Sequence, residues 1–121
     1  MTLVCYGGCL EEVEPALLHL FDEDELLCEV ICPTQIYPLN VEPIIESVTR
    51  TGRVLVVEEG PLVAGFGAEV IARLLESDVP VSRARRLGYG GVIPACLPLE
   101  LALLPNTQAV VETVRSMVDV H

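Results

Sequence analysis

Short apolar segments alternate with helix-like patterns along the chain, and this alternation restricts the folds open to it. Leu3–Cys5, Leu26–Cys32 and Arg53–Val57 are short and apolar, which is typical of buried strands. With a further strand at Val81–Leu87, the predicted order is β-α-β-α-β-α-β-loop-α. That order favours an α/β fold, a three-layer α/β/α sandwich with a largely parallel sheet between the helices.

Amphipathic stripes define the helices between these strands. Asn40 and Gly52 are expected to bound the second helix, and Pro105–Asn106 to begin the last. A short helix is expected at Leu99–Leu104. The positions expected to face the core are Val13, Leu17, Leu20 and Phe21 in the first helix, Val41, Ile44, Ile45 and Val48 in the second, Val70, Ile71, Leu74 and Leu75 in the third, and Val110, Val111, Val114, Met117 and Val118 in the last.

Strand composition also predicts positions within the sheet. Arg53–Val57 is the most apolar strand, so we expect it at the centre, covered on both faces. Val81–Leu87 alternates apolar and polar residues, which indicates an edge strand or one wet face.

Length and hydrophobicity suit one globular domain over residues 1–121. The hydrophobic fraction is 51%, and no apolar run reaches the roughly 20 residues that span a bilayer. No basic region precedes an apolar one at the start, so we expect no signal peptide and a cytoplasmic location.

The net charge of −11, with arginine as the only strongly basic residue type, disfavours nucleic acid and anionic membranes as partners. It is compatible with a basic protein partner. Arg83, Arg85 and Arg86 form the one basic cluster, which could hold a phosphate or pair with acids of another subunit.

The five cysteines and two histidines do not form a recognisable catalytic or metal motif. Cys5 and Cys9, like Cys28 and Cys32, are separated by three residues, whereas structural zinc sites commonly have two between paired ligands. Reduced thiols that fill the core are the favoured interpretation, and no metal site is expected. His19 and His121 have no nucleophile suggested beside them, so we expect no catalytic residue.

The stretch RVLVVEEGPLVAGFGAEV, residues 53–70, poses the main functional question. A strand followed by glycines and a helix could hold the phosphate of a nucleotide in the Gly60–Gly67 turn. However, Val70 stands where a dinucleotide fingerprint needs glycine, and Glu69 would compete with a phosphate at the helix start. We therefore favour a structural turn and keep phosphate binding as the alternative.

Glu58 and Glu59 follow the predicted central strand, at the edge where α/β sheets bind ligands. Two carboxylates there could perform acid–base chemistry. The favoured alternative is that one pairs with an arginine or caps a neighbouring turn.

Three parts of the sequence carry a family resemblance: VCYGG at Val4–Gly8, the segment Cys28–Arg53, and EEG-x4-GFGAE at Glu58–Glu69, which is the most specific motif. With these parts in the same order, nearly the whole chain resembles the C-terminal domain of the transketolase superfamily. The likeness is greatest to the beta subunit of thiamine-diphosphate-dependent 2-oxo acid dehydrogenases. One departure is Ile31-Cys32-Pro33, where many relatives have Asp-Leu-Arg.

The resemblance implies a five-stranded sheet with one antiparallel strand. It also implies that thiamine diphosphate and magnesium bind between other domains of the parent enzyme, so this domain binds no cofactor and is inactive alone. The implied partners are a second copy, the alpha subunit or cofactor-binding domains, and the basic binding domain of a dihydrolipoyl acyltransferase. The residues expected at a subunit interface are Glu58, Glu59, Gly60, Leu62, Val63, Gly65, Phe66, Gly67 and Glu69.

Overall fold

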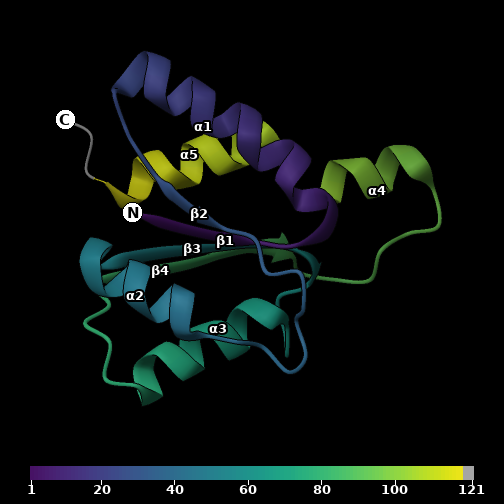
Figure 1. Ribbon diagram of the computed structural model, residues 1–121. Coiled ribbons are helices and arrows are strands. Elements are labelled where there is room, and N and C mark those ends of the chain that lie inside the picture. The colour runs from purple at the N-terminus through teal and green to yellow at the C-terminus, as the bar shows by residue number, and fades with distance from the viewer. Residues whose placement is uncertain (119–121) are drawn as a thin grey trace.

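The computed structural model describes residues 1–118 and has a parallel sheet at its centre (Figure 1). Its strands are β1 (Thr2–Cys5), β2 (Glu29–Ile31), β3 (Arg53–Pro61) and β4 (Arg83–Tyr89), in the order β2-β1-β3-β4. Each neighbouring pair is parallel. The predicted α/β class is confirmed, with β3 inside the sheet and β4 at its edge.

Helices cover both faces of the sheet and form the two outer layers of the sandwich (Figure 1). One layer contains α1 (Leu10–Asp24) and α5 (Thr107–Met117), and the other contains α2 (Glu42–Thr51) and α3 (Phe66–Glu76). A short 3₁₀ helix, η1 (Gly7–Cys9), joins β1 to α1. The remaining helix, α4 (Leu97–Leu103), extends beside the start of α1, away from the sheet. No helix within residues 1–118 is long and apolar enough to cross a membrane.

The strand count differs from the expectation of five strands with one antiparallel. Residues 1–118 contain four strands, all parallel. The chain between Tyr89 and Leu97 is irregular and includes Gly90, Gly91 and Pro94. Proline has no backbone N–H for a strand ladder and glycine is unfavourable in strands, so this segment leads into α4 without pairing.

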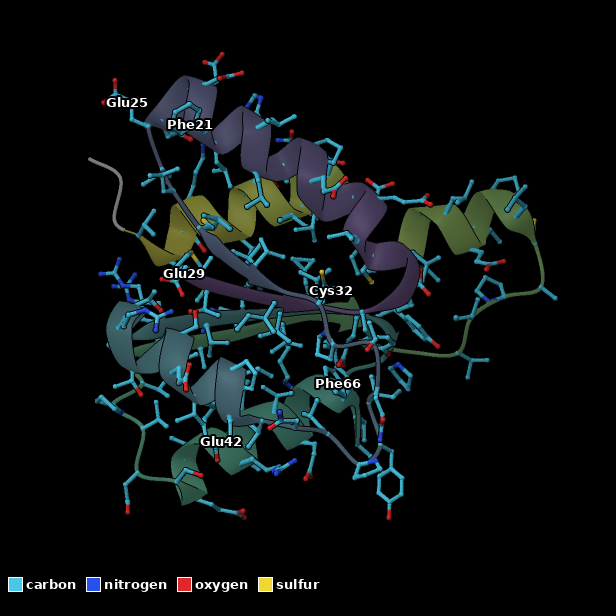
Figure 2. The ribbon with its side chains drawn as sticks, viewed as in Figure 1. Phe21, Glu25, Glu29, Cys32, Glu42 and Phe66 are labelled. Atoms are coloured by element: carbon cyan, nitrogen blue, oxygen red, sulfur yellow. The ribbon has the colours of Figure 1, made fainter. Side chains whose placement is uncertain are left out.

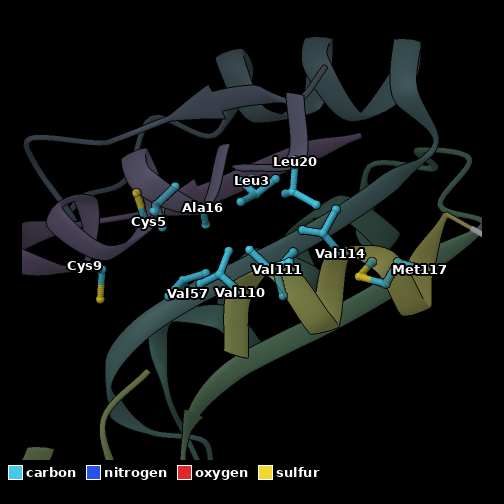
Figure 3. Packing of buried hydrophobic residues seen from close by; sticks show 12 residues of the cluster. Leu3, Cys5, Cys9, Ala16, Leu20, Val57, Val110, Val111, Val114 and Met117 are labelled. Atoms are coloured by element: carbon cyan, nitrogen blue, oxygen red, sulfur yellow. The ribbon is translucent and has the colours of Figure 1, made fainter. Parts of the chain in front are cut away.

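Two hydrophobic clusters fill the spaces above and below the sheet. Leu55 and Val57 of β3 face the α1/α5 layer, whereas Val54 and Val56 face the α2/α3 layer. Figure 3 shows the first cluster, in which Leu3, Leu20 and Val114 meet. Because β3 has buried side chains on both faces, its nearly continuous apolar run is explained.

Two predicted core positions lie instead at the surface. Phe21 of α1 and Leu75 of α3 are both more than half exposed. In each helix the buried residues lie one position earlier, at Leu20 and Leu74. One residue turns the helix by about 100°, which carries the next side chain to the margin of the buried face.

Candidate functional site

The candidate site lies at the carboxyl ends of β1 and β3. Along the chain, β2 is added to one side of β1, and β3 is then added to the other side. The strand order therefore reverses between β1 and β3, which is the topological switch point. Ligands of open α/β sheets bind outside the strand ends at such a point. We call this region, with the loops that follow β1, β3 and β4, the carboxyl edge.

An irregularity in β3 shapes this edge. Val57 pairs with Leu87 and Pro61 with Tyr89, so the three residues from Glu58 to Gly60 face only Gly88 of β4. Bulges of this kind re-aim side chains at the ends of strands. Here Glu58 turns toward α3, whereas Glu59 lies against Gly8 on the opposite side. The two carboxylates therefore do not form an acid–base pair.

Glu58 caps the first turn of α3 from inside the protein. Its side chain is fully buried, and its Oε2 accepts a hydrogen bond of 2.5 Å from the Gly67 N–H. A carboxylate at a helix N-terminus is stabilised by the helix dipole. Its other oxygen, Oε1, has no hydrogen-bond partner within residues 1–118. The predicted role of one glutamate as the cap of a neighbouring turn is confirmed.

The environment of Glu58 affects its protonation. Burial raises the pKa of the Glu58 carboxyl above its ordinary value, while the Gly67 N–H and Arg86 act in the opposite direction. Burial and the nearby Glu58 charge also raise the pKa of Tyr6. The carboxylate is thus poorly solvated, and the Gly67 N–H and Arg86 offset only part of the free-energy cost of burying its charge.

Three glycines allow the chain to close around this carboxylate. A Cβ on Gly65 would lie 2.4 Å from Glu58 Oε1, and one on Gly67 would lie 3.0 Å from Oε2. A Cβ on Gly88 would lie 2.9 Å from the Gly60 carbonyl oxygen and 3.2 Å from Glu58 Cγ. These glycines are needed for close approach to Glu58, not for a positive φ.

Phe66 anchors the β3–α3 loop to the end of β1. Its ring meets Tyr6 edge to face, with ring centroids 4.9 Å apart (Figure 2 labels Phe66). Glu69 lies in the first turn of α3 as predicted, but it is exposed, and Glu58 supplies the carboxylate that accepts from Gly67. A phosphate bound to this N–H would have to displace a buried side chain.

The expected interface residues divide into a supporting set and an exposed set. Glu58 and Gly67 are buried within the chain. Gly60, Leu62, Gly65 and Phe66 are partly exposed, and Glu59, Val63 and Glu69 are exposed. The β3–α3 loop includes Ala64 at φ 55°, a strained conformation for a residue other than glycine.

Sequence reasoning missed two residues of this site, Tyr6 and Gly88, and named Arg86 only as part of a basic cluster. Arg86 Nη1 donates to the Leu62 carbonyl oxygen and lies beside Gly67. The available signal was the glycine at position 88, since glycine inside a strand often marks close backbone approach. The predicted arginine cluster does not converge, because Arg83 donates to the Ser116 and Met117 carbonyls on the α5 side.

The remaining candidates are dispersed. Within residues 1–118, no three His, Cys, Asp or Glu side chains are arranged to hold a metal ion. Cys5 and Cys9 are buried, Cys28 is partly buried, and Cys32 and Cys96 are exposed. His19 is exposed on α1, and His121 lies outside the described residues.

Comparison with known proteins identifies the family. A family model described as "Transketolase, C-terminal domain" matches residues 1–110. The chain belongs to this family. The matched residues include EEG-x4-GFGAE, the motif that here carries Glu58, Gly65 and Gly67.

Several curated relatives are subunits of dehydrogenases. The chain is 33% identical over 98% of its length to "2-oxoisovalerate dehydrogenase subunit beta 2, mitochondrial" of Arabidopsis thaliana, covering 33% of that protein. It is 35% identical over 82% of its length to "Pyruvate dehydrogenase E1 component subunit beta" of Rickettsia bellii, covering 31%. The chain thus spans about a third of the length of these relatives.

A solved structure shares the fold. "Split gene transketolase, inactive beta4 tetramer" superposes with a TM-score of 0.82 at 22% identity, over 95% of this chain and 38% of that one. At this identity the match supports the transketolase C-terminal fold alone.

Proposed function

We propose that residues 1–121 are one association domain of a thiamine-diphosphate-dependent enzyme, a 2-oxo acid dehydrogenase beta subunit or a transketolase-like protein. Membership of the transketolase C-terminal family and the beta-subunit relatives support this proposal. Thiamine diphosphate and magnesium then bind elsewhere in the parent enzyme. A cytoplasmic location remains a prediction, since one relative is named mitochondrial.

The observation that carries the association role is an uncovered apolar surface at the carboxyl edge. The main part of this surface is the helix α4, which contains no buried residue. About half or more of the side chain is exposed at each of its leucines, Leu97, Leu99, Leu101 and Leu103. In a helix, positions 97 and 101 lie on one side and 99 and 103 on another. A helix that is apolar on several sides is typical of one buried by a neighbour.

The β3–α3 loop extends this surface. The Leu62 N–H donates to the Tyr89 carbonyl oxygen, so this loop lies beside the chain that leads to α4. Val63 and Val92 are exposed on these two segments. We call α4 with Val63 and Val92 the apolar edge, and we infer that a second copy of the chain covers it. The structural relative is named as a tetramer, which is a reason to test self-association of this chain.

Docking of a basic domain, as on a dihydrolipoyl acyltransferase, is a further part of this proposal. Glu11, Glu12 and Glu59 line a hollow of about 210 Å³ beside the start of α1. Acidic side chains gathered there suit a partner with lysine or arginine, and the net charge of −11 favours its approach.

We expect the 121-residue chain to show no 2-oxo acid decarboxylation by itself. The assay supplies pyruvate or 3-methyl-2-oxobutanoate with thiamine diphosphate and magnesium, and follows carbon dioxide release. An intact dehydrogenase serves as the positive control. Turnover by this chain alone would contradict the association role.

Self-association through the apolar edge is expected to weaken at least tenfold in Leu99→Asp. A charged side chain at a dry interface costs well over the roughly 1.4 kcal/mol that corresponds to a factor of ten. Sedimentation equilibrium of the purified chain measures the dissociation constant.

Leu75→Asp is the matched control. Leu75 is 58% exposed and Leu99 is 56% exposed, both on helices, but Leu75 lies near the end of α3, away from the apolar edge. We expect Leu75→Asp to associate like the unmodified chain. A monomeric unmodified chain at high concentration, or equal effects of both substitutions, would refute this interface.

A further inference from the structure

Two cysteines lie at the ends of neighbouring strands. The ladder between β1 and β2 pairs Leu3 with Val30 and Val4 with Ile31, so Cys5 and Cys32 are the next pair in register. Paired residues of a parallel ladder point to the same face, and side chains alternate along each strand. Leu3, Cys5 and Val30 all contact the α1/α5 cluster, which places Cys32 on the same side as Cys5.

The spacing of the two strands suits a disulfide. Neighbouring strands lie about 4.8 Å apart, within the Cα separation of roughly 4.4–6.8 Å that disulfides require. The Cys32 thiol is also near enough to Cys5 to contribute to the raised pKa of the Cys5 thiol. All five cysteines are free thiols in this structure, with Cys32 at the end of β2 (Figure 2).

The two thiols differ in access. Cys5 is fully buried, and burial together with the neighbouring Cys32 raises the pKa of its thiol to about 12. Cys32 is exposed, at the point where the chain leaves β2. A small reagent can therefore reach Cys32 first, and Cys5 reacts only as the second, internal partner.

We propose that Cys5 and Cys32 form a redox-active pair that small-molecule disulfides oxidise to a disulfide bond between β1 and β2. The Cys32 thiolate attacks a disulfide R–S–S–R, forms a mixed disulfide and releases one thiolate. The Cys5 thiol loses its proton, attacks the Cys32 sulfur and releases the second thiolate. The two protein thiols are thereby oxidised, and one small disulfide is reduced to two thiols.

This bond would join the short edge strand β2 covalently to the interior strand β1. Because β2 has only three residues, it is the strand with fewest ladder bonds to hold it. Oxidation would fix the point at which the chain leaves the sheet for the 32–41 connection. The pair acts independently of the proposed association role.

The test incubates the 121-residue chain with oxidised glutathione, blocks remaining thiols by alkylation, and analyses intact mass and digested peptides. We expect three alkylated cysteines instead of five, the loss of two hydrogen atoms from the linked pair, and one linked peptide pair containing Cys5 and Cys32. Cys32→Ser and Cys5→Ser should each abolish the link. Cys96→Ser, which removes the other exposed cysteine, should retain it.

Other products would overturn the proposal. Oxidation that stops at a glutathione adduct on Cys32, or a link from Cys32 to Cys9, would show that Cys5 is not the partner. An unreacted chain would show that the two thiols cannot be oxidised in place. Because Cys5→Ser could unfold a buried site, the peptide map of the unmodified chain decides the outcome.

Discussion

Replacing Gly65 with alanine is expected to destabilise the chain by about 1–3 kcal/mol, the usual cost of forcing extra atoms into a packed region. The new Cβ would lie 2.3 Å from the Pro61 carbonyl oxygen and 2.4 Å from Glu58 Oε1. Gly65 has φ −80°, which alanine adopts readily, so the cost is steric. Urea unfolding followed by circular dichroism measures the change in free energy of unfolding.

Gly90→Ala is the matched control for this substitution. A Cβ on Gly90 would meet no atom of residues 1–118 within 4 Å, and its backbone does not have a positive φ. We expect its free energy of unfolding to stay within about 0.5 kcal/mol of the unmodified chain, as is usual for surface sites. Equal stability of the two variants would show that the chain does not close tightly around Glu58.

The sheet could be predicted from the sequence because its strands differ in apolarity. The run Val54–Val57 is buried on both sides, and only an interior strand needs apolar residues at every position. Val81–Leu87 alternates with arginines, and β4 is accordingly an edge strand. Asn106 was expected at the start of the last helix, where its Oδ1 accepts from the Ala109 N–H at 2.9 Å.

Helical periodicity locates a stripe but not its centre. The patterns in α1 and α3 include both members of each adjacent pair, Leu20 with Phe21 and Leu74 with Leu75. Packing against the sheet buries only the first of each pair. The choice depends on how each helix is rotated over the sheet, which its own residues do not specify. The expectation of a fifth strand was based on the family resemblance alone, and no segment of this sequence has a strand pattern that would supply it.

The candidate site was only partly predictable, because it combines residues from β3, β4 and the start of α3. Glu58, Gly65 and Gly67 lie in one stretch and could be identified together. Gly88 meets Glu58 only because β4 pairs with β3 beside the three-residue irregularity. No local pattern encodes that register, so Gly88 signalled a close backbone approach but not that Glu58 is the residue it meets.

The substitution Glu58→Gln is expected to change the pH dependence of stability. Burial raises the pKa of Glu58 in the folded chain above its ordinary value of about 4.3 in the unfolded chain. Between these two values the folded state binds more protons, so stability falls as pH rises through this interval. Above the pKa of Glu58 in the folded chain this loss of stability is complete, and below its pKa in the unfolded chain the loss is absent.

Glutamine removes this loss because it cannot ionise, and its carbonyl oxygen can still accept from the Gly67 N–H. The stability of Glu58→Gln relative to the unmodified chain should therefore rise with pH, by at most about 1.4 kcal/mol per pH unit for one proton. Urea unfolding from pH 4 to pH 8 measures this difference. Glu69→Gln, on the exposed side of the same helix, serves as the control.

The direction of the slope separates two explanations of the buried carboxylate. If Glu58 mainly stabilised the fold through its charge on the first turn of α3, the relative stability of Glu58→Gln would fall with rising pH. A rising difference would mean that desolvation exceeds the helix dipole and Arg86 together. The unpartnered Oε1 and complete burial favour the rising slope, because no second donor within residues 1–118 compensates the charge.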